Sequence, residues 1–284
     1  MPELPEVETI RLGLQNKIAG LKIDDMEVRV TKIFQGEKKD VVGTKIKDLR
    51  RRAKILIFDL DNGKSLIVHL KLTGQLVFHK NGDLATFGHP IPFAGATLPA
   101  STTHVIFTFN NGSKLFYNDV RKFGYIKVVQ TNEVEKLKVM AEFGPEPFTK
   151  EFTLEKFKSI LLKKKKPVKL VLMDQSQIAG VGNIYANEAL FLSRIHPQKL
   201  ANQLNEDQIK KLYESLLLVL KEGIKYGGSS ENAYVNALGG KGTMQEHFRV
   251  YAQTGKVCFN RCGGVVKRIS LGGRGTFFCP KCQR

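Results

Sequence analysis

Hydrophobic positions near the start of the chain recur with the period of an α-helix. The apolar residues are separated by three or four positions and are Val7, Ile10, Leu14, Ile18 and Leu21. They therefore fall on one stripe of a helix. Pro5 suits the first helical turn, where its missing N–H is not needed, and the acids at 6 and 8 suit the positive end of the helix dipole. The pattern predicts a helix that begins near residue 5.

The following hundred residues change to short runs rich in β-branched and aromatic side chains. These runs predict strands at 54–60, 65–70, 75–78, 103–109, 114–118 and 125–129. Asn-Gly pairs lie between them at 62–63, 81–82 and 111–112, and Asn-Gly is a strong hairpin signal. Strands joined by such turns indicate an antiparallel sandwich or barrel. The Gly- and Pro-rich stretch 87–101 is predicted as a loop.

The second half of the chain has helical patterning. The segment FGPEPFTKEF at 143–152 carries two prolines and is interpreted as a linker. Helical periodicity follows at 153–165, 184–194 and 206–225. The Gly-rich polar stretch 227–247 is predicted as a mobile loop, since long loops are usually functional or disordered.

The charge of the chain narrows the class of partner. Lys and Arg total 45 against 27 Asp and Glu, a net charge of +18. Such an excess favours a polyanion, and nucleic acid above all, although simple solubility also explains a basic chain. An anionic membrane surface is the rival, but no basic amphipathic helix with a strong apolar face supports it. No run approaches the roughly 20 apolar residues of a membrane span, and no signal peptide is recognised, so a cytoplasmic protein is expected.

All four cysteines lie in the last 27 residues. They form C-x3-C, then sixteen residues, then C-x2-C, and are Cys258, Cys262, Cys279 and Cys282. Two short hooks separated by a hairpin can place four thiolates tetrahedrally around Zn²⁺, so one structural zinc ion is predicted. A redox-active dithiol pair is the alternative. A zinc ion bound by four thiolates would have no open coordination position for catalysis. The hairpin between the hooks carries Lys267, Arg268 and Arg274, which can contact phosphate.

Two further stretches carry candidate chemistry. In IAGVGNIY, Gly180 and Gly182 precede Asn183 and a helical run, which suits a phosphate-binding turn as well as a plain helix–helix turn. At the opening MPELPEVETI, removal of Met1 would leave Pro2 as a free secondary amine. A terminal amine has a pKa of about 7.7–8.0 against about 10.4 for lysine, so a useful fraction is neutral and nucleophilic near pH 7.

Several motifs occur together and in a fixed order. They are PELPEVET (2–9), RRAK (51–54), HLKLTGQL (69–76), NDVRKFG (118–124), GPEP (144–147), LMDQSQIAGVGNIYANEALF (172–191) and GGRGTFFCPKCQR (272–284). Over nearly its whole length the chain resembles the bacterial formamidopyrimidine-DNA glycosylases, whose family also contains endonuclease VIII. The leucine of PELPE favours the formamidopyrimidine branch, because the endonuclease VIII pattern has glycine there.

The resemblance implies an α+β fold with a division into domains. An N-terminal helix and an antiparallel β-sandwich would form a catalytic domain at 1–142, followed by the linker at 143–152. A helix–two-turns–helix DNA-binding domain would occupy 153–250, with a loop around 227–245 that closes over the damaged base. A zinc finger would occupy 251–284. These bounds agree with the pattern of elements described above.

The resemblance also implies roles for individual residues. Pro2 would be the nucleophile, Glu3 would protonate the sugar ring oxygen, and Lys54 and Arg274 would hold phosphates in the catalytic site. Glu6 and Glu188 would support the site, with Glu188 near the sugar. The residues implied in DNA binding, including the side chains that fill the gap left by a flipped nucleotide, are His69, Leu72, His104, Arg121, Phe123, Lys169, Asn183 and Tyr185.

Three of these residues also have plain structural interpretations. Lys54 stands beside Arg51 and Arg52 and suits a solvated basic edge; His69 suits a satisfied core histidine, and Phe123 a core aromatic. The chain departs from the family pattern in its C-x3-C hook, in Leu72 for methionine, and in Val120 and Lys122 for proline and arginine. None of these changes touches Pro2, Glu3 or Lys54.

The expected activity is that of a bifunctional DNA glycosylase and abasic-site lyase for oxidised purines in base excision repair. Its partner would be double-stranded DNA with oxidised bases or abasic sites, bound by a monomer at the bacterial nucleoid and without a membrane. The alternatives are the same chemistry on oxidised pyrimidines, or a non-catalytic zinc-ribbon DNA-binding protein. Glu3 and Lys54 argue against the last, since binding alone does not require them.

Overall fold

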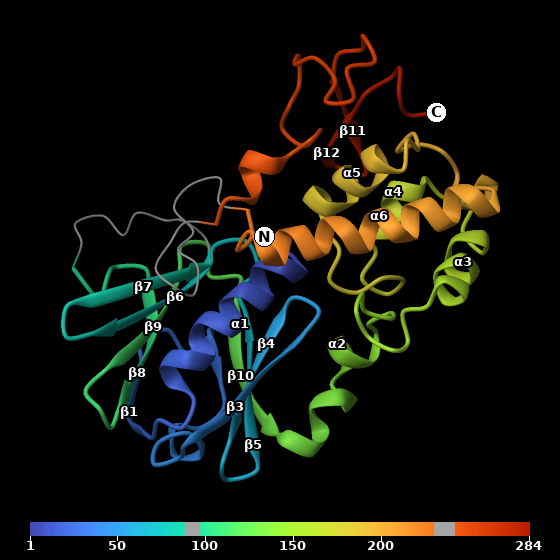
Figure 1. Cartoon of the computed structure of the whole chain (residues 1–284). Coiled ribbons are helices and arrows are strands. Elements are labelled where there is room, and N and C mark those ends of the chain that lie inside the picture. Colours follow the sequence, from blue (N-terminus) through green and yellow to red (C-terminus); the bar gives the residue numbers. More distant parts are fainter. Residues whose placement is uncertain (89–96, 230–241) are drawn as a thin grey trace. The chain divides into compact units, whose positions relative to one another are not determined.

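The computed structural model describes residues 1–88, 97–229 and 242–284 (Figure 1). The chain divides into two compact units. Unit 1 comprises Met1–Ala141 and Tyr226–Gln245, and unit 2 comprises Glu142–Lys225 and Glu246–Arg284. Each unit is described by itself.

Unit 1 contains two α-helices and ten strands among its described residues. The helices are α1 (Leu4–Ile18) and α2 (Lys138–Ala141). The strands are β1 (Ile23–Val28), β2 (Phe34–Gln35), β3 (Ile46–Arg52), β4 (Ile55–Leu60), β5 (Lys64–His69), β6 (Gly74–Lys80), β7 (Asp83–Gly88), β8 (Thr103–Phe109), β9 (Lys114–Asp119) and β10 (Tyr125–Gln130).

The ten strands form two five-stranded sheets. Their orders are β1-β8-β9-β6-β7 and β2-β10-β5-β4-β3. All pairs are antiparallel except β2 with β10. Alternate residues of the strands face one shared core, as Leu56 and Phe58 of β4 and Leu115 and Tyr117 of β9 do. The sheets therefore form the predicted antiparallel sandwich, and the α+β fold class is confirmed.

Helix α1 packs against this core through the apolar stripe that the sequence predicted. Val7, Ile10, Leu14 and Ile18 are all buried in the core of unit 1. The helix starts at Leu4 with Glu3 as its N-cap and ends at Ile18, so Leu21 of the predicted stripe lies beyond it. The prediction of the helix is confirmed, and its end is three residues earlier than the apolar pattern indicated.

The predicted hairpins are confirmed, but four strands were missed. The Asn-Gly pairs at 62–63, 81–82 and 111–112 join β4 to β5, β6 to β7 and β8 to β9. Asn81 and Gly82 both have positive φ, as a type I′ turn requires. The missed strands are β1, β2, β3 and β7, and every one of them lies at the edge of a sheet.

Unit 2 contains helices and one small hairpin. Its helices are α3 (Leu154–Leu162), α4 (Val168–Met173), α5 (Asn183–Leu192) and α6 (Glu206–Lys225). Its strands β11 (Lys267–Leu271) and β12 (Arg274–Phe278) pair antiparallel between the two cysteine hooks. Helix α4 was not predicted, while α3, α5 and α6 match the helical stretches of the sequence.

The segment 143–152, interpreted as a linker, packs onto unit 2. Phe152 is buried and stacks on Tyr213 of α6, whose hydroxyl donates to the Phe152 carbonyl at 2.8 Å. The amides of Gly144 and Ala179 complete backbone bonds between this segment and residues 175–179. The domain bounds expected from the sequence stay predictions, and the segment itself is held by specific contacts.

Two expectations concern segments that are only partly described. Most of the predicted loops at 87–101 and 227–247 lies outside the described residues, which lack 89–96 and 230–241. Within them, Gly88 ends β7, and Met244–His247 forms a 3₁₀ turn. Among the described residues, no helix combines the length and the apolar character needed to cross a membrane.

Candidate functional site

The N-terminus of the chain is fixed at the first turn of α1. Pro2 and Glu3 are both buried. The Glu3 N–H donates to the Glu6 carboxylate at 2.9 Å as part of a capping box that begins the helix. Glu6 also accepts the Ser229 N–H at 3.0 Å, so its carboxylate joins the start of α1 to the segment that follows Tyr226. Glu6 therefore links the N–H of Glu3 to that of Ser229, and its supporting role in the site stays a prediction.

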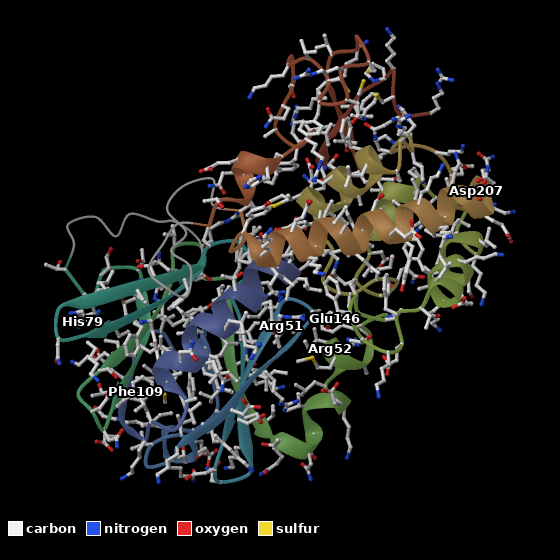
Figure 2. All side chains as sticks on the ribbon, viewed as in Figure 1. Arg51, Arg52, His79, Phe109, Glu146 and Asp207 are labelled. Carbon is white, nitrogen blue, oxygen red and sulfur yellow. The ribbon has the colours of Figure 1, made fainter. Side chains whose placement is uncertain are left out.

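Lys54 lies in the two-residue turn between β3 and β4, not within a strand as the sequence pattern indicated. Ala53 in the same turn has a φ of 51°. Arg51 donates to the Ala53 carbonyl at 3.0 Å and to Glu8 of α1 at 2.8 Å. Figure 2 marks Arg51 and Arg52 at the end of β3, beside α1. One arginine therefore ties the turn that carries Lys54 to the helix that carries Glu3.

Glu8 is the acidic partner in this connection. Its carboxylate also accepts two bonds from the guanidinium of Arg11, at 2.6 and 3.0 Å. Burial acts to raise the pKa of Glu8, but the hydrogen bonds from Arg11 and Arg51 outweigh it and lower the pKa below its ordinary value. Glu8 is therefore ionised at neutral pH and holds both arginines.

His69 ends β5 at the same end of the sheet as Lys54. Its Nδ1 accepts the Lys71 N–H at 3.1 Å, and its ring lies 5.7 Å from that of Tyr125. Burial, together with the charges of Lys71 and Lys54, lowers the pKa of His69 to about 3. The ring is therefore neutral at physiological pH, and it offers Nε2–H rather than a positive charge.

The predicted wedge residues lie on two connections between the sheets. Leu72 is half-buried on the connection from β5 to β6, and Arg121 and Phe123 are exposed on the connection from β9 to β10. Phe123 is 52% exposed, with the Arg121 guanidinium 4.7 Å from its ring centroid. Interpretation of Phe123 as a core aromatic is excluded. His104 lies behind this loop, and its Nε2 bonds the Asp119 carbonyl at 2.7 Å.

Unit 2 presents Arg274 at the tip of the β11–β12 hairpin. Arg274 is exposed at the first position of β12. Lys169 of α4 is fully buried, and its Nζ donates to the Thr276 hydroxyl at 2.7 Å and the Gly275 carbonyl at 3.1 Å. The DNA-binding role implied for Lys169 stays a prediction, and its ammonium bonds the hairpin that carries Arg274. This geometry favours a role in holding Arg274.

The other predicted residues of unit 2 come from α5. Asn183 is the first residue of the helix rather than its cap, because Gly182 holds the N-cap position. Tyr185 is fully buried against Gly223 of α6, so its ring does not face solvent. The Glu188 carboxylate is also fully buried and accepts the N–H groups of three consecutive residues, Arg249, Val250 and Tyr251.

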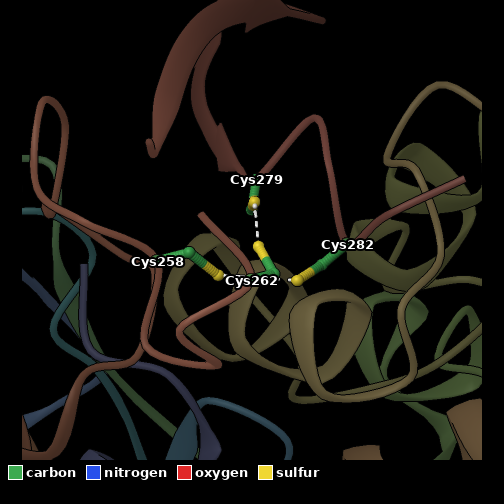
Figure 3. Close-up of side chains that lie close together, drawn as sticks. All are labelled: Cys258, Cys262, Cys279 and Cys282. Carbon is green, nitrogen blue, oxygen red and sulfur yellow. Dashed lines mark hydrogen bonds between the residues drawn. The ribbon is translucent and has the colours of Figure 1, made fainter. Parts of the chain in front are cut away.

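The four cysteines converge at the end of unit 2 (Figure 3). Their Sγ atoms lie within 4.8 Å of one another. The pairs Cys258–Cys282 and Cys262–Cys279 are 3.5 and 3.6 Å apart, far beyond a disulfide bond of about 2.05 Å. Zn–S bonds of about 2.3 Å in a tetrahedron require S···S separations near 3.8 Å. The thiol set therefore fits one structural Zn²⁺, and the C-x3-C hook closes it.

Family models match three consecutive parts of the chain. The formamidopyrimidine-DNA glycosylase N-terminal domain matches residues 1–126, and the H2TH domain of the same enzymes matches 143–234. The zinc finger found in FPG and IleRS matches 255–284, over the four cysteines. The chain belongs to the formamidopyrimidine-DNA glycosylase family.

Named relatives and solved structures agree over the full length. The formamidopyrimidine-DNA glycosylase of Pelotomaculum thermopropionicum is 40% identical and covers 100% of this chain and 99% of its own. That of Streptococcus mutans is 38% identical over 100% of both. A Lactococcus lactis Fpg in complex with abasic-site DNA superimposes with a TM-score of 0.88 at 36% identity, over 99% of both chains. A point mutant of the same Fpg in complex with DNA that contains Fapy-dG gives 0.88 at 37% identity, over 100% of both.

Some residues that organise this glycosylase scaffold were not found from the sequence. Glu8, Arg51, Thr73 and Asp119 were given no role in the site, because the bonds from Arg51 to Glu8 and from Thr73 to Asp119 join segments that are far apart in the chain. A signal existed for Asp119, since an aspartate just before a turn often accepts the N–H two residues later. The Arg121 N–H does donate to its Oδ1, at 3.2 Å.

Proposed function

We propose that this protein is a bifunctional DNA glycosylase and abasic-site lyase that removes oxidised purines, among them 8-oxoguanine and formamidopyrimidines. Membership of the formamidopyrimidine-DNA glycosylase family supports the reaction class and the lesion class. The observation that best supports the residue assignment is the bridge from Glu8 to Arg51, which ties the helix start at Pro2 and Glu3 to the turn at Lys54.

The first step would use the amine that removal of Met1 exposes at Pro2. Its lone pair attacks C1′ of the damaged nucleotide, the C1′–N bond breaks, and the base leaves with the electron pair and takes up the proton that the amine loses. Glu3 donates a proton to the ring oxygen as the sugar opens. The C1′–O bond of the sugar ring breaks as the nitrogen lone pair forms a C=N bond, and because the secondary amine has no N–H left to lose, the adduct stays a cationic iminium.

Strand cleavage would follow from that cation. The iminium withdraws electrons and acidifies the C2′ proton, which a base removes while the C3′–O bond breaks and the 3′ phosphate leaves. A second elimination then expels the 5′ phosphate. Lys54 would hold the phosphate beside the lesion and Arg274 would grip a backbone phosphate, and a positive charge at a phosphate stabilises it as a leaving group.

Access to C1′ requires the nucleotide to leave the base stack. Leu72 and Phe123 would fill the gap with apolar bulk, and Arg121 would donate to the base left unpaired. The exposure of Phe123 and its contact with the Arg121 guanidinium support this assignment. The protein would act as a monomer on duplex DNA at the nucleoid of a bacterial cytoplasm.

Borohydride trapping tests the chemistry directly. Met1-processed protein is mixed with an end-labelled duplex that holds one 8-oxoguanine opposite cytosine, with and without borohydride. A covalent complex that mass spectrometry maps to Pro2 is expected. A variant that retains Met1 should bind the duplex but form no complex, while the surface variant Asp24→Asn should react normally. Full activity of the Met1-retaining variant would overturn the mechanism.

The lesion class needs its own comparison. The same protein is offered duplexes with 8-oxoguanine or thymine glycol in competition, and faster removal of the purine is expected. Preference for thymine glycol would assign the protein to the oxidised-pyrimidine branch instead.

A further inference from the structure

The two connections that carry the predicted wedge run side by side between the sheets. The first, 70–73, leaves β5 and enters β6, and the second, 120–124, leaves β9 and enters β10. Gly74 pairs with Asp119 across one sheet, and His69 pairs with Tyr125 across the other. The two connections are therefore neighbours at both of their ends.

Asp119 lies where these connections meet. It is the last residue of β9, and its side chain is fully buried. Its Oδ1 accepts the Thr73 hydroxyl from the first connection and the Arg121 N–H, at 3.2 Å, from the second. Its Oδ2 accepts the Gly124 N–H at 2.8 Å. One carboxylate thus receives donors from both loops.

The backbone of both loops depends on such support. Lys71 and Lys122 have left-handed φ values of 50° and 54°, which non-glycine residues adopt at some cost. At Gly124 a Cβ would lie 1.9 Å from the Tyr117 hydroxyl and 2.7 Å from the His69 carbonyl, so the second loop packs too closely there for any side chain. Conformations of this kind persist only where the surroundings hold them.

We propose that Asp119 is a positioning residue that locks the Leu72 connection and the Arg121–Phe123 connection into one rigid wedge. The proposal rests on the proposed function, since it assumes that these loops enter damaged duplex DNA. Asp119 itself touches neither the base nor the sugar. Its effect reaches the reaction through Leu72, Arg121 and Phe123, which must stand at fixed positions before a nucleotide is extruded.

Asp119→Asn is the sharpest perturbation. Asparagine keeps one oxygen for Thr73 and Arg121, but it places an NH₂ group against the Gly124 N–H, so two donors face each other. We expect excision of 8-oxoguanine from a duplex to fall roughly 10- to 100-fold, since small misplacement of reacting partners has effects of that order. Thermal unfolding followed by circular dichroism reports whether the fold is kept.

Two readouts separate positioning from general damage. Strand cleavage of a single-stranded abasic oligonucleotide needs no extrusion from a stack, and Asp119→Asn should leave its rate close to that of the unchanged protein. The fluorescence rise of 2-aminopurine placed beside the lesion reports extrusion, and it should become slower. Thr73→Val, which removes the hydroxyl that donates to Asp119 and accepts the Arg121 N–H at 3.1 Å, should reproduce part of the defect, and Thr73→Ser should restore normal extrusion.

A double-mutant cycle with Phe123→Ala completes the test. If Asp119 acts through the wedge, Asp119→Asn should cost little in a protein that already lacks Phe123. Independent, additive losses would overturn the proposal, as would a normal duplex rate in Asp119→Asn or equal loss on both substrates. If the unchanged protein cleaves neither the 8-oxoguanine duplex nor the abasic oligonucleotide, the proposed function is wrong. If it cleaves both, the proposed function holds and the rates of the variants alone test the role of Asp119. Should Asp119→Asn not fold, the Thr73 pair carries the same comparison.

Discussion

Replacement of Glu188 distinguishes two roles that sequence and structure give this residue. The sequence resemblance places Glu188 near the sugar, whereas its carboxylate is fully buried and holds a run of backbone. It accepts the N–H groups of Arg249 at 3.0 Å, Val250 at 2.9 Å and Tyr251 at 2.8 Å. Burial raises the pKa of Glu188, and these three donors oppose that rise.

The size of the effect follows from the donors that lose their acceptor. Hydrogen bonds to a charged group contribute about 1.5–3 kcal/mol each, and an unsatisfied buried donor costs a similar amount. The three bonds share one carboxylate and are not independent, so Glu188→Ala should destabilise the 249–251 segment by about 4 kcal/mol. Glu188→Gln keeps one oxygen and should cost about 1–2 kcal/mol.

Amide hydrogen exchange measures the loss of stability at residues 249–251 themselves. A local measurement is needed because a chain of two units need not unfold in one step. We expect faster exchange at residues 249–251 in both variants and no change in β4 and β5. Glu214→Gln, an exposed acid on α6, is the matched control. If exchange at 249–251 stays unchanged while strand cleavage is lost, the carboxylate acts on the substrate and the structural argument is wrong.

Three further predictions follow from the described contacts. The stability that ionised Glu8 contributes should be complete above its unfolded pKa of about 4.3 and should be lost as the pH falls through its lowered folded pKa. The melting temperatures of the unchanged protein and of Glu8→Gln should therefore converge in acid, and a difference that stays constant with pH would contradict the ion pair. Arg274→Ala should reduce the slope of log affinity against log salt by about 0.9, the contribution of one phosphate contact, without changing which lesion is chosen; an altered lesion preference in competition assays would argue against a phosphate contact. Metal analysis should find one zinc per chain. Chelation of the zinc should speed hydrogen exchange at the amides of 255–284 but not at those of β4 and β5, because structural zinc supplies roughly 10–16 kcal/mol of local folding free energy. Unchanged exchange at 255–284 would show that the finger folds without metal.

The strands that could be predicted from the sequence and those that could not differ in one physical respect. Central strands such as β4 (ILIFDL) are buried along their whole length, so their apolar runs are plain in the sequence. In the edge strand β1 (IDDMEV) only Ile23 and Met26 are buried, with exposed acids between and after them, and β3 (IKDLRRR) ends in arginines. Charged residues on edge strands protect against unwanted pairing, and they also hide the strand from a search based on hydrophobicity.

The residues of the candidate site also divide into those that the sequence located and those that only the fold could place. Groups defined by local sequence, such as the helix start at Pro2 and the two cysteine hooks, lie where the pattern indicated. The environments of Lys169 and Glu188 could not be foreseen, because their partners are more than 60 residues away in the chain. Motifs identify such residues as important, but only the fold shows whether a polar side chain faces a ligand or its own backbone.

The buried ionisable residues of the two units share one arrangement. Glu6 holds Ser229, Asp119 holds Arg121 and Gly124, Lys169 holds the hairpin of Arg274, and Glu188 holds 249–251. In each case a charge on a regular element binds the backbone or hydroxyl groups of a neighbouring turn or loop. A short loop has little core of its own, and a charged hydrogen bond is strong enough to fix it. Substitution of only the exposed residues would therefore underestimate how much of the loop geometry depends on groups that never reach the surface.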